Sequence, residues 1–89
     1  MRKTKEMIAK ACRDFVDAMI RKFPDLEADI SAEPWEGSDA WIEFGLPEDY
    51  TDEYREAVQD ETVRLAWEFR GKTGVSIISS LTLKEALHG

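Results

Sequence analysis

The sequence predicts an α+β domain of two layers, a sandwich whose elements follow in the order α-β-β-α-β-α. Two long segments carry apolar residues every three or four positions, as amphipathic helices do, and three short segments alternate apolar with polar residues, as half-buried strands do. We therefore expect a three-stranded sheet with the two long helices on one face, followed by a short C-terminal helix. The 89 residues suffice for one core, so residues 1–89 are expected to form a single domain.

The first element is a helix expected over residues 4–23. Thr4 suits the N-cap position, and Pro24 ends the helix because the residue before a proline is disfavoured in the α conformation. The apolar side chains fall along one wide face, formed by Met7, Ile8, Ala11, Cys12, Phe15, Val16, Met19, Ile20 and Phe23. We expect this face to cover the sheet.

Two strands are expected next, over residues 26–33 and 40–46. Residues 34–39 have the composition of a hairpin loop, so the two strands should be antiparallel. Alternation predicts the inward positions Leu26, Ala28, Ile30 and Ala32 in the first strand, and Ile42, Phe44 and Leu46 in the second. Trp41 and Glu43 are then directed to the opposite face of the sheet.

The second half of the chain predicts a helix over residues 52–70, a strand over 75–81 and a short helix over 83–88. Thr51 suits the N-cap of the long helix, and residues 71–74 form its exit. Thr82 and Glu85 have the spacing of a capping box before the last helix. The third strand directs Ile78 away from the core, and it could pair with either edge of the hairpin.

Charge is distributed unevenly along this acidic chain, whose net charge is −7. Residues 1–23 hold seven basic residues against three acids, whereas residues 25–61 hold fourteen acids against one base. Nucleic acid is therefore an unlikely partner for most of the surface, because its affinity for proteins comes largely from neutralising phosphates. The basic first helix is the local exception.

Five residues are predicted to lie outside the core and to have side chains that suit a protein interface. Projection of the second helix at 100° per residue places Val63 and Trp67 nearly opposite its core side. Trp41, Glu43 and Ile78 are expected on the open face of the sheet. Since tryptophan is enriched at the centres of protein interfaces, these five are the candidate partner-binding residues.

No catalytic, metal or cofactor site is expected. The single histidine, His88, is next to the C-terminus, and the acidic residues do not form a calcium-binding loop. Cys12 lies on the apolar face of the first helix and is expected in the core. No apolar run approaches the ~20 residues that a membrane span needs, and the chain does not begin with a signal-peptide pattern, so we expect a cytoplasmic protein.

These observations favour a small, acidic, non-enzymatic protein-interaction domain, such as an adaptor, an inhibitor or an immunity-like protein. Its partner would be another protein, basic in character, or a second copy of the chain forming a homodimer. One alternative is a small-molecule-binding or catalytic crevice between the hairpin and the helices, using a carboxylate such as Asp14 or Asp17. Another alternative is a weak nucleic-acid contact through the basic first helix, with Lys10 and Arg13.

Overall fold

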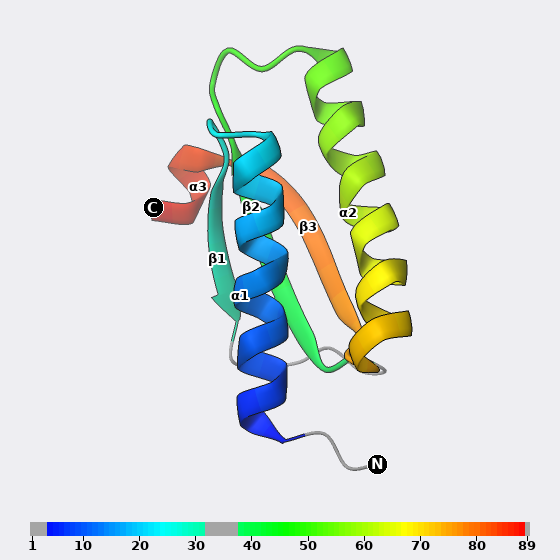
Figure 1. The fold of residues 1–89 in the computed structure, drawn as a ribbon. Helices are drawn as coiled ribbons and strands as arrows, with labels where there is room; N and C mark the ends of the chain where they lie inside the picture. The colour runs from blue at the N-terminus through cyan, green and yellow to red at the C-terminus, as the bar shows by residue number, and fades with distance from the viewer. Residues whose placement is uncertain (1–3, 32–37, 89) are drawn as a thin grey trace.

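The computed structural model describes residues 4–31 and 38–88 and has the predicted order of elements. These elements are α1 (Lys5–Lys22), β1 (Glu27–Ser31), β2 (Ala40–Leu46), α2 (Asp52–Thr73), β3 (Ile77–Leu83) and α3 (Lys84–His88). Helices α1 and α2 lie next to one another on the same face of the three-stranded sheet (Figure 1). The predicted α+β fold, with two long helices on one face and a short last helix, is confirmed.

The strand order, which the sequence left open, is β1-β2-β3. The central strand β2 pairs antiparallel with β1, as the hairpin predicted, and parallel with β3. Asp39 fixes the start of the parallel pair, because its carboxylate accepts a hydrogen bond of 2.8 Å from the backbone N–H of Ser76. The backbone N–H groups of Asp39 and Ala40 in turn donate to the carbonyl of Ser76. Both outer strands, β1 and β3, are therefore edge strands.

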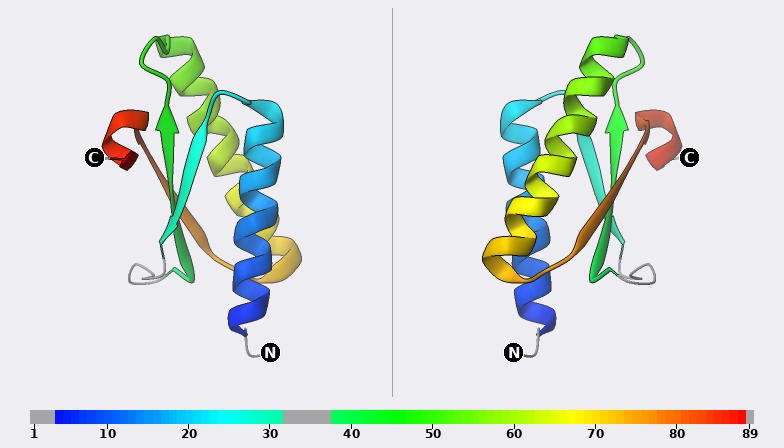
Figure 2. Two further views of the ribbon diagram at one scale, coloured as in Figure 1. Left: turned by 90° about the vertical axis from the view of Figure 1, so that its left-hand side faces the viewer. Right: turned by 90° about the vertical axis from the view of Figure 1, so that its right-hand side faces the viewer.

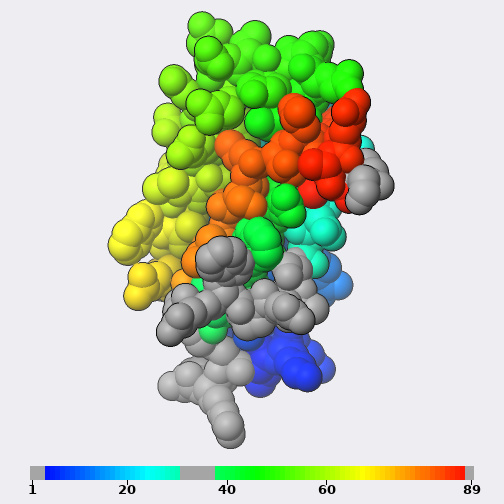
Figure 3. Space-filling model, turned by 180° about the vertical axis from the view of Figure 1, so that it is seen from behind, coloured from blue at the N-terminus to red at the C-terminus, as the bar shows by residue number. Residues whose placement is uncertain are grey.

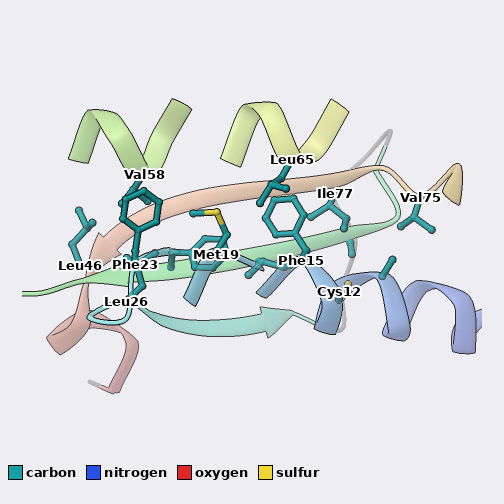
Figure 4. Close-up of a cluster of buried hydrophobic side chains, with 14 residues drawn as sticks. Cys12, Phe15, Met19, Phe23, Leu26, Leu46, Val58, Leu65, Val75 and Ile77 are labelled. Atoms are coloured by element: carbon teal, nitrogen blue, oxygen red, sulfur yellow. The ribbon is translucent and has the colours of Figure 1, made fainter. Parts of the chain in front are cut away.

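The core lies between the two long helices and the sheet, and Phe15 of α1 is at its centre (Figure 4). The ring of Phe15 is fully buried, with its centroid 6.2 Å from that of Phe44 on β2 and 5.4 Å from that of Phe69 on α2. The second contact is edge-to-face, a favoured arrangement of aromatic rings. The Phe15 side chain thus joins α1, α2 and the central strand of the sheet.

Threonines begin both long helices as predicted. The Thr4 hydroxyl accepts a hydrogen bond from the Met7 N–H, and the Thr51 hydroxyl accepts one from the Tyr54 N–H. The predicted end of the second helix, residue 70, is wrong by three residues, because α2 continues to Thr73. Gly74 ends α2, since it adopts the left-handed conformation (φ 76°) that other residues avoid.

The last strand and helix also begin later than expected. Strand β3 covers Ile77–Leu83 instead of 75–81, and α3 begins at Lys84 instead of residue 83. The predicted capping box at Thr82 is wrong, because Thr82 is a strand residue paired with Gly45 of β2. Pairing with the central strand here takes precedence over the local helix-start pattern.

Helix α3 packs on the face of the sheet opposite α1 and α2 (Figure 2). Gly45 permits this approach, because a Cβ atom built at this residue would lie 2.5 Å from Cδ1 of Leu87 and 3.1 Å from Cα of Lys84. The upper end of the face that the sequence predicts to be open is therefore covered.

Ile30 is a second correction, because it was expected in the core and is 43% exposed. It lies on the edge strand β1, beside a hollow that α1 borders with residues such as Ala9, Cys12 and Arg13. The helix does not cover this end of the strand. Residues 32 and 33, which the sequence assigns to the same strand, lie outside the described residues.

Glu61 is a buried carboxylate that joins α2 to α1. Its side chain, which is 10% exposed, accepts hydrogen bonds from Arg64 Nη2 at 2.6 Å, Arg64 Nε at 3.0 Å and Lys22 Nζ at 3.2 Å. Hydrogen bonding to Arg64 is the main reason that the pKa of Glu61 falls from 4.5 to about 2, against the opposing effect of burial.

The Glu61 carboxylate should make the stability of the protein depend on pH in a defined direction. Because the pKa of Glu61 is lower in the folded than in the unfolded chain, its stabilisation is present above about pH 4.5 and is lost as the pH falls towards 2. We expect Glu61→Gln to lower the free energy of unfolding by about 1–2 kcal/mol at pH 7. Urea unfolding at pH 7 and pH 3 should show this difference shrinking at pH 3; an equal difference at both would contradict the assignment.

The contact between Gly45 and α3 predicts a coupled pair of substitutions. Gly45→Ala should lower the free energy of unfolding by about 1–3 kcal/mol, because the new methyl group overlaps Leu87. In a Leu87→Ala background the same substitution should cost less, because the nearest overlapping atoms are gone. Equal costs in the two backgrounds, measured by urea unfolding, would show that α3 does not pack on Gly45.

Candidate functional site

The outward side of α2 carries two large apolar side chains that the core does not use. Val63 is 54% exposed and Trp67 is 68% exposed, and they are one helical turn apart. The opposite side of the same helix buries Val58 and Leu65 against the sheet. The projection of the sequence thus placed both residues outside the core, where the structure has them.

Arg70 places a positive charge directly beside this apolar pair. Its guanidinium carbon lies 5.8 Å from the centroid of the Trp67 ring, which is within the range of a cation–π contact. The contact places the guanidinium next to the indole on the surface of α2. Tryptophan and arginine, together with tyrosine, are enriched among the energetically dominant positions of protein interfaces.

A groove separates the outward side of α2 from the beginning of β3. It consists of two adjoining hollows of about 160 and 230 Å³, both of which Trp67 and Ile77 border. We call it the edge groove; its lining residues are Gln59, Thr62, Val63, Ala66, Trp67 and Arg70 from α2, and Ser76, Ile77 and Ser79 from the strand side. Seen from behind, α2 (green to yellow) runs along the free side of β3 (orange), where this groove lies (Figure 3).

The other predicted residues lie on the sheet face turned away from the long helices. Trp41 is half-buried there, and its indole N–H donates a hydrogen bond of 3.1 Å to the Ser80 hydroxyl. Ile78, the register partner of Trp41 on β3, is 41% exposed. Glu43 faces Asp29 across the antiparallel pair, so two carboxylates are neighbours on this face.

The structure brings two of the five predicted residues, Val63 and Trp67, together at the edge groove. Ile77 and Ser79 of β3 line this groove with them, whereas the side chain of Ile78, which lies between these two residues in the chain, is on the opposite face of the sheet. We call the lining residues of the edge groove, Val63 and Trp67 included, the α2–β3 surface. Trp41 and Glu43 have their side chains on the same face as Ile78 and therefore lie outside this surface.

Among the lining residues that were not predicted, three belong to α2 and are close to the predicted pair in helical spacing: Gln59, Ala66 and Arg70. Each is three or four residues from Val63 or Trp67, so helical spacing alone could have placed them on the same side. The participation of β3 could not have been found in this way, because it depends on how α2 packs against the strand.

No chemical site stands out among the residues that the structure describes. Within them, no group of three or more His, Cys, Asp or Glu side chains could hold a metal ion. Cys12 is buried, and burial raises the pKa of its thiol. Asp14 and Asp17 are exposed, and Asp14 forms an ion pair of 2.9 Å with Lys10. The helices in the described part of the chain include none that is both long and apolar enough to cross a membrane.

Comparison with known proteins gives no match, since neither a family model nor a curated protein nor a solved structure matches this chain. The function must therefore be inferred from the surface of the chain itself.

Proposed function

We propose that this chain is a non-enzymatic, cytoplasmic protein-interaction domain whose partner binds the α2–β3 surface. The observation that carries the proposal is Trp67, which is 68% exposed at the border of the edge groove. Burying an indole removes a large apolar area from water and orders only two side-chain torsions, so a partner that covers Trp67 gains much at small entropic cost.

Neighbouring groups supply the other components of a protein interface. Val63 extends the apolar area along the groove, while Arg70 holds a charge at its rim. A central aromatic anchor surrounded by polar groups is the usual arrangement of interface residues that dominate binding. Glu43 and Asp29 place two carboxylates on the sheet face turned away from α2, where they favour basic groups on a partner that extends past β3.

The two alternative functions have less support from the described residues. The hollow between α1 and β1, which is about 520 Å³, is bordered by charged surface residues such as Glu6 and Arg13 and has no catalytic cluster among the residues described. Two basic residues of α1 are already engaged, because Lys10 pairs with Asp14 and Lys22 pairs with Glu61. Protein binding through α2 therefore remains the function that the geometry favours.

Site-specific photo-crosslinking in the cells that produce the protein would test this proposal. A photoreactive aromatic amino acid at position 67, which keeps a large aromatic side chain at this site, should give a discrete protein adduct, because the partner covers this residue. The matched control is position 17, where Asp17 is exposed on α1. Absence of an adduct at position 67, or the same adducts from both positions, would contradict the proposal. Both variants should retain the wild-type unfolding free energy to within about 0.5 kcal/mol, since surface changes have small effects.

A further inference from the structure

Along the outward side of α2, an acidic and a basic residue lie at equal distances on either side of Val63. Val63 is flanked by Glu56 on one side and Arg70 on the other, and each is seven residues, about two turns, away. At 100° per residue all three lie within about 40° of one another around the helix. All three are exposed, so one stripe of α2 has an acidic end, an apolar middle and a basic end.

We propose that a second copy of this chain binds here, with the two α2 helices antiparallel about a two-fold axis near Val63. The inference rests on the proposed function, which it deepens by naming the partner. In this arrangement Glu56 of each copy faces Arg70 of the other, because both residues are equally far from the axis. Trp67 faces Gln59 of the other copy for the same reason, since each is four residues from Val63.

Charge complementarity favours this partner. On the outward side of α2, the acid Glu56 lies two turns before Val63 and the base Arg70 lies two turns after it. Antiparallel packing therefore brings Glu56 against Arg70 twice, while parallel packing would bring like charges together. A chain with a net charge of −7 generally repels another acidic chain, and the two Glu56–Arg70 pairs oppose that repulsion at the contact.

The other described helices and strands leave the outward side of α2 accessible to a second copy. Helix α3 crosses the sheet towards β1, where Leu87 borders a hollow with Leu26 and Ala28. In Figure 3, α3 (red) accordingly lies on the side of the molecule away from the outer side of α2. The same two-fold axis makes the contact isologous, so it closes at a dimer and does not propagate into a filament.

Charge-reversal variants provide a sharp test by solution mass. Sedimentation equilibrium from micromolar to millimolar concentration should show a monomer–dimer equilibrium for the wild type. Glu56→Arg and Arg70→Glu should each weaken the dimer about tenfold, because each places two like-charged pairs in the contact. The double variant should restore the wild-type dissociation constant to within about threefold. Lys72→Glu is the matched control, because Lys72 lies on the opposite side of the same helical end.

The outcomes separate this inference from the proposed function. A monomer at every concentration would overturn self-association, as would a dimer unaffected by both single reversals. Weakening by both reversals without rescue in the double variant would overturn the antiparallel arrangement. If self-association fails but position 67 still crosslinks to another protein, the proposed function stands with a different partner. If position 67 crosslinks to nothing, both proposals are wrong.

Discussion

The packing of Phe15 against both Phe44 and Phe69 is the interaction on which the rest of the structure depends. It holds α1 and α2 on one face of β2, and the alternation of β2 places Phe44 on that face. A helix that packs on one face of a sheet buries against it only the side that is turned towards the sheet. The 22 residues of α2 therefore present their second side to solvent, and in this chain that second side is not purely polar.

The elements that the sequence predicted well are those whose pattern is local. Alternation in β2 and helical spacing in α1 fix the buried side chains without reference to the remainder of the chain, and Thr4 and Thr51 bind the first turns as capping residues do. Features that depend on distant segments could not be predicted. The parallel pairing of β3 determines that Thr82 belongs to a strand, and the incomplete cover of α1 over β1 leaves Ile30 exposed.

The features of the candidate site likewise divide into those that local sequence predicts and those that depend on distant segments. Val63 and Trp67 follow from the projection of one helix, whereas the bond from Trp41 to Ser80 joins residues 39 positions apart and requires the strand register. That hydrogen bond distinguishes Trp41 from Trp67. The indole N–H of Trp41 already has a partner in the fold, while most of the Trp67 side chain is in contact with water. This difference in exposure is the reason that we propose Trp67, and not Trp41, as the principal anchor for a partner.

One NMR measurement tests most directly the claim that the outward side of α2 binds a second copy of the chain. The indole N–H signals of Trp67 and Trp41 would be assigned by substitution and followed as the protein is concentrated from micromolar to millimolar. We predict that the Trp67 signal shifts with concentration, because the second copy covers it, while the Trp41 signal stays fixed by its bond to Ser80. A fixed Trp67 signal, or a Trp41 signal that shifts alone, would contradict the account.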